Sequence, residues 1–461
     1  MPEPSPTAAG KHPLHRIVIV GGGAGGLELA TQLGHRLGRK GLAHVTLIEK
    51  SRSHFWKPHL HEIAAGSIDV HAHATDYLAQ ARWHGFRYRV GEMVGLDREQ
   101  RLVHVAPVLD EDGQPVSPPY TRAYDTLVMA VGSQTNDFGT PGVAEHAIAL
   151  ETPEQAQRFH RQLVNACLRA HMQETPLSAR QLQIAIIGAG ATGVELSAEL
   201  RHTTRALLSY NLEHIDPERG IRLNLIEAGP RILPALPERI AVSAAALLGD
   251  LGVSVRTSSR VVSVGHEGVL LASGELVPAE LVVWAAGVKA PDFLHQLAGL
   301  ESNRINQLVV KPTLQTTRDE AIFALGDCAA APWLGQSKKA SDTGDSGIPI
   351  NVPPRAQAAH QQASHLAAQI ERRLRQPGAA LEPWRYRDFG SLVSLGEYST
   401  VGNLMGALIG GNLWVEGLFA RLMYLSLYKM HQVALHGWWR TALGTASRLL
   451  TRGTEPRVKL H

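Results

Sequence analysis

Residues 16–30 read Arg-Ile-Val-Ile-Val-Gly-Gly-Gly-Ala-Gly-Gly-Leu-Glu-Leu-Ala, an apolar run followed by glycines and then a helical pattern. The glycines fit G-x-G-x-x-G at Gly21, Gly23 and Gly26. In this pattern the first glycine allows a tight turn, the second leaves room for a pyrophosphate, and the third lets the helix pack close to the strand. Unpaired N–H groups at the helix start then face the phosphate. The stretch predicts a dinucleotide-binding strand–turn–helix unit.

A second copy of the pattern lies in residues 183–197, Gln-Ile-Ala-Ile-Ile-Gly-Ala-Gly-Ala-Thr-Gly-Val-Glu-Leu-Ser, with Gly188, Gly190 and Gly193 in the three glycine positions. Each copy lies between a β-branched apolar run and a helical pattern, which is the context that makes the motif informative. Two units in one chain predict two nucleotide cofactors. Two adjacent cofactors suggest that electrons pass from one to the other.

Each unit also ends its second predicted strand in an acid, Glu49 after residues 43–48 and Glu227 after residues 221–226. A carboxylate at this position accepts hydrogen bonds from ribose hydroxyls and repels a 2′-phosphate. Glu227 therefore favours NADH over NADPH, an expectation that Arg231, four residues further on, weakens slightly. The alternative is that both are solvated acids at strand ends.

The composition is that of a globular chain of two or three domains, with 461 residues, 44% hydrophobic and 19% charged. The formal charge of +3 and the lack of a basic run interleaved with aromatics argue against a nucleic-acid partner. Cys167 and Cys328 are far apart and form no C-x-x-C, so no redox-active disulfide is expected. No uncharged apolar stretch is long enough to cross a bilayer.

The fold class predicted is α/β, with two Rossmann-like domains, the second inserted into the first because an apolar strand ending at Asp327 returns late in the chain. The pairs His59/His61 and His71/His73 lack a clear further ligand, so no metal site is expected. Residues 335–350 are polar and predict a mobile surface loop. The predicted boundaries are a loose tail at 1–15, a first nucleotide domain at 16–150 and 309–395, a second at 151–308, and a C-terminal region at 396–461.

The segment from Trp414 to His436 predicts an amphipathic helix. Its cations gather opposite an apolar face, as in helices that lie in a membrane interface, and Trp438-Trp439 suits an interfacial position. The alternative is that the helix packs against the body of the protein or a second copy of the chain in a homodimer. The apolar face comprises Phe419, Met423, Leu427, Met430, Ala434 and Trp438, and the cations are Arg421, Lys429, His436 and Arg440, followed by Arg448, Arg452, Arg457 and Lys459.

From about residue 15 to its end, the chain resembles the flavin-dependent pyridine nucleotide oxidoreductases, and within them the type II NADH:quinone oxidoreductases, the single-subunit, non-proton-pumping NADH dehydrogenases of respiratory chains. The fingerprints are common to the superfamily, whereas the segments around Glu195, Gln361 and the C-terminal helix are more specific. The matching segments are 21–26, Trp56-Lys-Pro58, 188–195, Trp284-Ala-Ala-Gly-Val-Lys289, Leu325-Gly-Asp-Cys328, Pro353-Pro-Arg-Ala-Gln-Ala-Ala-His-Gln361, 425–432 and His436-Gly437.

The resemblance implies FAD in the first nucleotide domain and NADH in the second. It implies that Gly326 and Asp327 contact FAD at the ribityl or pyrophosphate region, and that Lys57 lies near the flavin edge. Gly132 and Gly287, which follow apolar strands, join the predicted cofactor-binding residues, which are Gly21, Gly23, Gly26, Glu49, Lys57, Gly132, Gly326 and Asp327 for FAD, and Gly188, Gly190, Gly193, Glu227 and Gly287 for NADH.

Three residues carry the expected chemistry. The resemblance puts Glu195 at the junction of nicotinamide, flavin and quinone, where it orients substrate or takes part in proton delivery. It puts Gln357 and Gln361, four apart on one helix face, at the quinone headgroup. Taken from the residues alone, Glu195 is an acid favoured by the helix dipole and the two glutamines are a polar helix face.

The expected activity is two-electron transfer from NADH through FAD to a membrane quinone, at the cytoplasmic face of the inner or cell membrane. Two rivals are a soluble flavin reductase of a protein electron carrier and a weakly catalytic redox-sensing flavoprotein. The basic amphipathic C-terminus favours the membrane NADH:quinone oxidoreductase over the soluble reductase. Sulfide:quinone oxidoreductases are near relatives, but they need catalytic cysteines at positions where this chain has none.

Overall fold

The computed structural model describes residues 13–110, 112–208, 220–337, 349–395, 400–404, 413–416 and 418–451. The chain divides into two compact units. The first unit comprises residues 1–54, 76–132 and 290–386, and the second comprises residues 55–75, 133–289 and 387–461. Because the first unit resumes at Asp76 and again at Ala290, the second consists of two insertions in it and a C-terminal extension.

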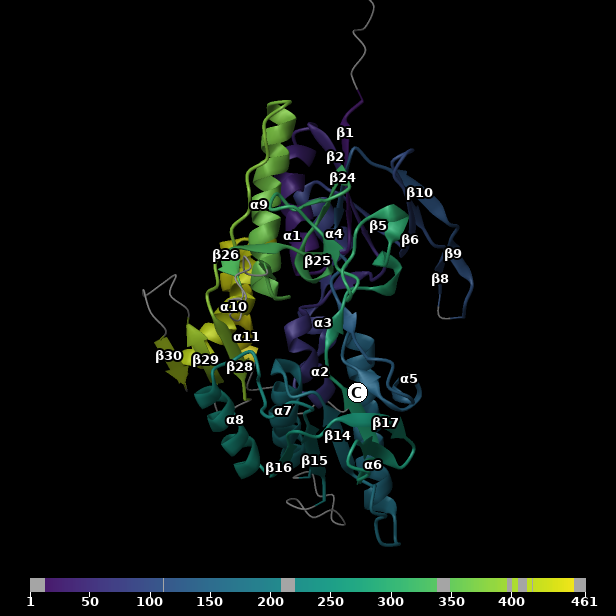
Figure 1. Cartoon of the computed structure of the whole chain (residues 1–461), viewed down its shortest axis with the longest axis vertical. Helices are drawn as coiled ribbons and strands as arrows, with labels where there is room; N and C mark the ends of the chain where they lie inside the picture. The colour runs from purple at the N-terminus through teal and green to yellow at the C-terminus, as the bar shows by residue number, and fades with distance from the viewer. Residues whose placement is uncertain are drawn as a thin grey trace, which may run out of the picture. The chain divides into compact units, whose positions relative to one another are not determined.

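The first unit is built on a six-stranded sheet in the order β23-β24-β11-β1-β2-β5. The pairs from β24 to β5 are parallel, and β23 is antiparallel at the edge. Helices α1 (Ala24–Leu33) and α9 (Ala356–Arg375) pack against each other beside it (Figure 1). The strands are β23 (Gln315–Thr316), β24 (Asp319–Ala324), β11 (Thr126–Met129), β1 (His15–Val20), β2 (Ala43–Glu49) and β5 (Arg87–Val90).

The apolar runs explain why these strands are central. The residues from Ile17 to Val20 in β1, and all four of β11, are buried, as expected of a parallel sheet covered on both faces. A bidentate ion pair joins the two strands, since Arg16 Nη2 and Nε donate to the Asp125 carboxylate at 2.7 and 3.0 Å. The hydrogen bond from Arg16 is the main reason that the pKa of Asp125 falls to about 2.

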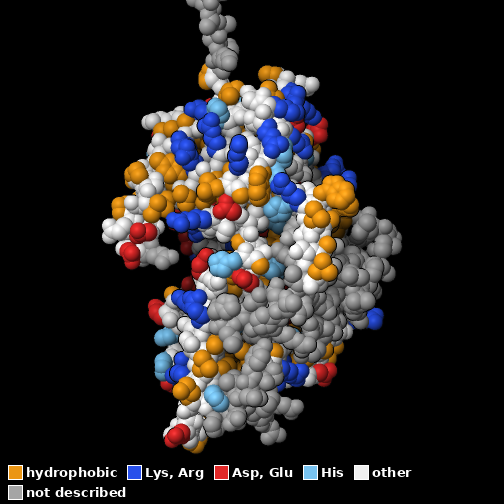
Figure 2. All heavy atoms as spheres, turned by 180° about the vertical axis from the view of Figure 1, so that it is seen from behind, with side chains coloured by type: hydrophobic (Ala, Val, Ile, Leu, Met, Phe, Trp, Pro, Cys, Tyr) orange, Lys and Arg blue, Asp and Glu red, His pale blue; other side chains and the backbone are white. Residues whose placement is uncertain are grey.

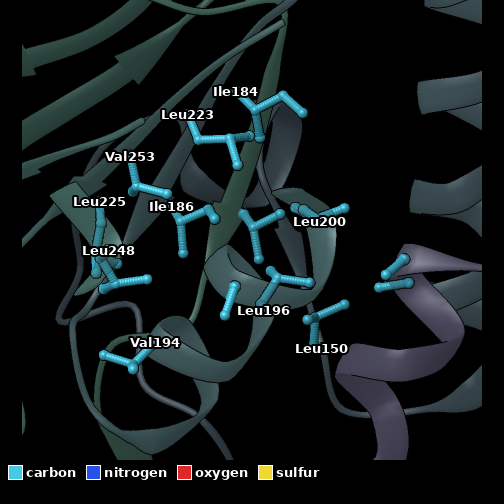
Figure 3. Packing of buried hydrophobic residues seen from close by; sticks show 14 of the residues in the cluster. Leu150, Ile184, Ile186, Val194, Leu196, Leu200, Leu223, Leu225, Leu248 and Val253 are labelled. Carbon is cyan, nitrogen blue, oxygen red and sulfur yellow. The ribbon is translucent and has the colours of Figure 1, made fainter. Parts of the chain in front are cut away.

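The second unit is built on a five-stranded parallel sheet in the order β13-β20-β14-β15-β16. Val194, Leu196 and Leu200 lie with Ile184, Ile186 and Leu223 in one buried cluster (Figure 3). A capping box at Thr152 and Gln155 starts the long helix α6. The elements are β13 (Ile148–Ala149), β20 (Leu281–Trp284), β14 (Gln183–Ile187), β15 (Arg222–Ile226), β16 (Val253–Arg256), α6 (Pro153–Met172), α7 (Ala191–Leu208) and α8 (Glu238–Asp250).

Shorter elements complete both units. Those of the first unit are η1 (Gly34–Gly38), β3 (Ser53–His54), α4 (Tyr77–His84), β6 (Met93–Asp97), β7 (Leu102–Val105), β8 (Val108–Leu109), β9 (Pro115–Ser117), β10 (Tyr120–Ala123), η3 (Asp292–Leu294), η4 (Leu297–Gly299), β22 (Leu308–Val309), η5 (Gly326–Cys328), β25 (Ala329–Ala330), β26 (Pro332–Ser337) and β27 (Pro349–Asn351). β4 (Thr75–Asp76) falls at the boundary.

Those of the second unit are η2 (Lys57–His59), α2 (Leu60–Ala65), α3 (Val70–His73), β12 (Gln134–Thr135), α5 (Val143–His146), β17 (Val261–Gly265), β18 (Gly268–Leu271), β19 (Leu276–Pro278), β21 (Val288–Lys289), β28 (Ser391–Ser394), β29 (Thr400–Leu404), β30 (Leu413–Glu416), α10 (Leu418–His436) and α11 (Trp438–Thr451).

The prediction of an α/β fold with two Rossmann-like units, one inserted in the other, is confirmed. The predicted start of the C-terminal helix is wrong, because Trp414 lies in β30 and pairs with Asn403 of β29, so the helix begins only at Leu418. A helical wheel considers only the spacing of side chains within one segment, so it does not detect pairing with a strand earlier in the chain. Residues 1–12 of the predicted tail and 338–348 of the predicted loop lie outside the described residues, whereas His15, the last residue of the predicted tail, lies in β1.

The C-terminal helices α10 and α11 meet at Gly437, which has a φ of +79°. On the described part of this pair, Met430, Trp438 and Leu443 are exposed, whereas His431 and Leu435 are buried. The side chains of Phe419, Met423 and Leu427 lie outside the described residues. Among the described residues, no helix combines the length and apolar character needed to cross a bilayer.

The described surface is mixed in character. On the face drawn in Figure 2, hydrophobic side chains are interspersed with Lys and Arg. Both cysteines are buried, Cys167 in α6 and Cys328 in η5, and burial raises the pKa of each thiol to about 11. Neither thiol therefore has the exposed, thiolate-stabilising surroundings of a redox cysteine.

Candidate functional site

The first glycine turn leaves no room for side chains at two of its three glycines. Gly21 has a φ of +101°, and a Cβ built on it would lie 2.3 Å from the Ala130 carbonyl oxygen. A Cβ on Gly26 would lie 1.9 Å from the Gly21 carbonyl oxygen. Over Gly23 the space is open, with no atom within 4 Å of a built Cβ. The turn therefore packs tightly on the sheet side and is open at the glycine that a pyrophosphate approaches.

The second turn repeats this geometry. Gly188 has a φ of +99°, and a Cβ on it would lie 2.7 Å from backbone atoms of Ala286. A Cβ on Gly193 would lie 2.0 Å from the Gly188 carbonyl oxygen, whereas nothing lies within 4 Å of one on Gly190. Both predicted fingerprints thus have the strand–turn–helix context and the open central glycine that a dinucleotide needs.

The two strand-end acids are fixed in matching ways. The Glu49 carboxylate accepts hydrogen bonds from the backbone N–H groups of Gly22 at 2.6 Å and Ser51 at 3.0 Å. The Glu227 carboxylate accepts from Ala189 at 2.9 Å and Gly229 at 2.7 Å. In both cases each carboxylate oxygen takes one backbone donor, which leaves further lone pairs to accept ribose hydroxyls.

The remaining predicted cofactor residues of the first unit lie at the same edge of its sheet. Gly21, Glu49, Gly132 and Gly326 end or follow the parallel strands β1, β2, β11 and β24. Ligands of open α/β sheets bind at the carboxyl ends of such strands. Asp327 follows in η5, where its carbonyl oxygen accepts a hydrogen bond from Gln307 Nε2 at 2.9 Å. The fold therefore brings these predicted residues together.

The corresponding residues of the second unit are arranged alike. Gly188 and Glu227 follow β14 and β15, and Gly287 lies three residues beyond β20. Gly287 has a φ of +66°, and a Cβ on it would lie 2.4 Å from the Phe138 ring. Lys57 is exposed in η2, and its Nζ donates to the Ser133 carbonyl at 3.1 Å.

Helix α9 carries both glutamines of the predicted quinone site, Gln357 and Gln361, half-buried in its first two turns. The next residue, Gln362, is buried, and its Oε1 accepts the Gly326 backbone N–H at 2.7 Å. The start of α9 is thus tied directly to the turn that holds Asp327. Gln362 carries no local sequence signal of this role, because its contact with Gly326 spans 36 residues.

Helix α9 is also held to α1 through Glu28, a buried acid of α1. Its carboxylate accepts hydrogen bonds from Gln32 at 2.9 Å, from Ser364 at 3.0 Å, and from the His360 ring. Glu28 therefore positions the helix that carries Gln357 and Gln361. Because α1 begins at Ala24, Glu28 lies beyond its first turn, where the helix dipole has little effect.

Glu195 is a buried acid, 7% exposed, on α7 of the second unit. One carboxylate oxygen accepts the Ser394 backbone N–H at 3.0 Å, and the other lies 3.6 Å from His61 Nδ1. Burial raises the pKa of Glu195 to about 8. The Ser394 hydrogen bond opposes the rise, and the charges of Glu62 and Glu199 add to it. At neutral pH this group is a carboxylic acid that can give a proton, which is more than its position in a helix indicates.

The residues around Glu195 include His61 and Glu62 on α2. The sequence indicates at most a metal-binding pair at His59 and His61, and it predicts no role for Glu62. His61 is 3% exposed, and burial is the main reason that its pKa falls to about 4. Glu62 accepts a hydrogen bond from His59 Nδ1 at 2.7 Å. Burial acts to raise the pKa of Glu62, but that hydrogen bond and the nearby imidazoles lower it overall. The cluster therefore joins a neutral imidazole, an ionised carboxylate and a protonated acid.

These features define a class of oxidoreductase fold, in which two Rossmann-like units each carry a glycine turn of the dinucleotide-binding type. The sequence pattern of the family described as pyridine nucleotide-disulphide oxidoreductase matches residues 15–363, and the chain belongs to that family.

Comparison with individual proteins narrows the class. The chain is 41% identical over 460 residues to the type II NADH:quinone oxidoreductase of Haemophilus influenzae, covering 97% of this chain and all of that one. It is 27% identical over 461 residues to the type II NADH:quinone oxidoreductase Ndh of Mycobacterium tuberculosis, covering 98% of this chain and 92% of that one. The fold matches the structure of NDH2 from Plasmodium falciparum in complex with NADH, with a TM-score of 0.78 and 18% sequence identity. The match covers 96% of this chain and 99% of that one. The chain is thus a member of the type II NADH:quinone oxidoreductases.

Proposed function

We propose that this chain is a peripheral membrane flavoenzyme that passes two electrons from NADH through FAD to a membrane quinone, without pumping protons. The observation that carries the proposal is the 41% identity to a type II NADH:quinone oxidoreductase along the whole chain. The two open glycine turns, each beside a carboxylate held by backbone N–H groups, support two dinucleotides in one chain.

The first unit takes FAD and the second takes NADH. FAD supplies the two-electron chemistry that accepts a hydride from NADH and reduces the quinone. Gly21, Gly23 and Gly26 accommodate its pyrophosphate, Glu49 its ribose, and Asp327 its ribityl or pyrophosphate region, with Lys57 near the flavin edge and Gly132 and Gly326 at the surrounding strand ends. In the second unit, NADH is held by Gly188, Gly190, Gly193, Glu227 and Gly287. Glu227 also repels a 2′-phosphate.

At the quinone, Gln357 and Gln361 donate hydrogen bonds from their amides to the carbonyl oxygens as negative charge develops there. Glu195 supplies a proton to the forming quinol. The buried, neutral state that its surroundings give it supports this role, because a general acid must hold its proton at the working pH.

The membrane contact is made by α10 and α11. Exposed Met430, Trp438, Trp439 and Leu443, with Lys429 and Arg440 among them, fit a helix pair that lies in the interface with its apolar side toward the acyl chains. We place the protein at the cytoplasmic face of the membrane, where NADH is available. A homodimer through the same helices is the competing use of this surface.

The test is steady-state kinetics of the purified protein with NADH or NADPH and a panel of ubiquinone and menaquinone analogues, with the flavin identified after release by denaturation. NADH-dependent quinol formation by FAD-loaded protein is expected. Flavin reduction by NADH with no electron transfer to any quinone, but rapid transfer to a ferredoxin-type carrier, would show instead a soluble carrier reductase.

A further inference from the structure

Three ionisable side chains in the second unit lie in a row. Glu62 Oε1 lies 3.9 Å from His61 Nε2, and His61 Nδ1 lies 3.6 Å from Glu195 Oε2. The imidazole therefore has one carboxyl group facing each of its nitrogens. Because imidazole can accept a proton at one nitrogen and release one from the other, this is an arrangement through which a proton can be passed.

Exposure differs along the row and is highest at Glu62 and lowest at His61. The side chain of Glu62 is 21% exposed, that of His61 is 3% exposed and that of Glu195 is 9% exposed. Water can therefore reach Glu62, whereas the ring that joins it to Glu195 is sealed. Both gaps exceed hydrogen-bond length by less than 1 Å, so a small side-chain rotation closes each.

The surroundings hold the row in place. The His59 ring donates to Glu62, and the Tyr428 ring of α10 packs edge-on against His59 with centroids 4.7 Å apart. The Ser394 backbone N–H fixes Glu195. The other ionisable neighbours are Glu199 on α7, which accepts a hydrogen bond from Ser67, His73 on α3, whose charge acts on Glu62, and His160 on α6, whose ring lies against Gly66.

We propose that His61 is a positioning residue for Glu195 that also passes it protons from Glu62, so that Glu195 is reprotonated after each quinone reduction. The proposal rests on the proposed function, because it takes Glu195 as the group that gives a proton to the quinone.

The proton and electron balance is simple. A quinone that receives two electrons, originally those of NADH, needs two protons to become quinol. In the step assigned here, the O–H bond of Glu195 breaks and an O–H bond forms on the quinone. The resulting carboxylate takes a proton from one nitrogen of His61, while the other nitrogen receives a proton that the ionised Glu62 carboxylate first accepts from water and then passes on.

The first experiment measures Glu195 directly, without NADH or quinone. The carboxylic-acid C=O stretch that disappears in Glu195→Gln is followed by infrared spectroscopy as the pH is raised. Because the Glu62 charge raises the pKa of Glu195, Glu62→Gln is expected to move the loss of this band to lower pH. His71→Gln, at an exposed histidine on the neighbouring helix α3, is the matched control and is expected to titrate like the parent. An unchanged titration in Glu62→Gln would contradict the coupling.

The second experiment separates the half-reactions by stopped-flow absorbance of the flavin. In His61→Phe, reduction by NADH is expected to keep the parent rate. Reoxidation by a short-tailed ubiquinone is expected to slow on the order of 100-fold, the lower part of the range that general acid–base groups contribute. Glu62→Gln is expected to slow the same step, and His71→Gln is expected to leave both steps unchanged.

A rescue experiment guards against misfolding. His61→Gly leaves a ring-sized space, and added imidazole is expected to restore reoxidation in a pH-dependent manner. The relay is overturned if His61→Phe and His61→Gly are both reoxidised at the parent rate with the parent pH profile. If instead the parent protein is reduced by NADH but not reoxidised by any quinone, the proposed function fails, and the infrared titration still tests the Glu62–Glu195 coupling independently.

Discussion

At the scale of single residues, the two strand-end carboxylates and the buried acid Glu195 have different physical bases. Glu49 and Glu227 are held by backbone N–H donors beside open glycine turns. Glu195 has one such donor and otherwise faces a neutral ring and two other acids. The first kind of site is suited to recognising a neutral diol, and the second to holding a proton.

Glu227 should set the choice of electron donor. Its carboxylate repels a 2′-phosphate, so NADPH is expected to have a far lower kcat/KM than NADH. Glu227→Gln should weaken that repulsion and so reduce the difference in kcat/KM between the two donors. Flavin reduction rates with each donor measure this. Glu267→Gln, at an exposed acid elsewhere in the second unit, is the control. Equal kcat/KM for both donors in the parent enzyme would contradict the assignment.

Glu195 should make the stability of the protein depend on pH. Its pKa is about 8 in the folded state and near the ordinary 4.5 in the unfolded state. Between these values the unfolded state binds fewer protons, so the free energy of unfolding falls as pH rises, by about 1.4 kcal/mol per pH unit at most. Glu195→Gln keeps an acceptor for Ser394 and should remove this fall.

Urea denaturation of the parent and Glu195→Gln at pH 5 and pH 8 is the measurement. The variant is expected to gain stability relative to the parent as pH rises between these values, by a few kcal/mol. The exposed Glu145→Gln reports the effect of losing any surface carboxyl group. A parent and variant that lose stability in parallel would show that Glu195 titrates normally.

At the scale of elements, the proposed function gives α9 two roles. Its second turn carries Gln361, and the adjacent Gln362 holds the Gly326 turn. Side chains on neighbouring positions of one helix point in different directions, so one can face a substrate while the other fixes a cofactor turn.

Gln361→Ala should therefore slow quinol formation and leave flavin reduction by NADH nearly intact. Loss of one hydrogen bond to a developing charge corresponds to roughly a 10²-fold to 10³-fold slower reoxidation. Stopped-flow absorbance separates the two half-reactions. Gln376→Ala, at an exposed residue beyond the far end of the helix, should behave like the parent. If Gln361→Ala slows only flavin reduction by NADH and leaves reoxidation by quinone unchanged, the assignment of Gln361 to the quinone site is wrong.

The elements also show what the sequence could and could not predict. The clashes at Gly26 and Gly193 are local, since each is with the carbonyl oxygen of the first glycine of the same turn, and they follow from the spacing of the motif. The clashes at Gly21 and Gly188 are with Ala130 and Ala286, which are distant in sequence. The Glu195–His61 contact joins residues from separate parts of the chain, and nothing in the spacing of either helix encodes it. The same holds for Gln362 and Gly326 and for the pairing of Trp414 with Asn403.

At the scale of the whole molecule, the question is what covers the exposed apolar side chains of α10 and α11. Met430, Trp438 and Leu443 are each more than 60% exposed. A packed helix pair in a soluble monomer would bury most of such surface, whereas an interfacial pair inserts it among acyl chains.

Replacing Met430, Trp438 and Leu443 together with Ser should release the protein from vesicles. Each loses about 1.5–3 kcal/mol of burial if fully inserted. Flotation with anionic liposomes measures binding, and activity with long-tailed quinones should fall more than with short ones. The control replaces Leu78, Met172 and Val242, which are also exposed and apolar but lie on α4, α6 and α8. If the triple variant floats like the parent and loses a dimer instead, the helices are an oligomer contact.

The burial of both cysteines has a practical consequence for labelling. With a thiol pKa of about 11, only about one molecule in 10⁴ carries a thiolate at either position at pH 7. A cysteine introduced at exposed Leu443 would be a few per cent ionised. A maleimide dye or nitroxide would therefore attach there selectively without removal of the native residues, and its quenching by lipid-borne probes would report how deeply α11 enters a bilayer.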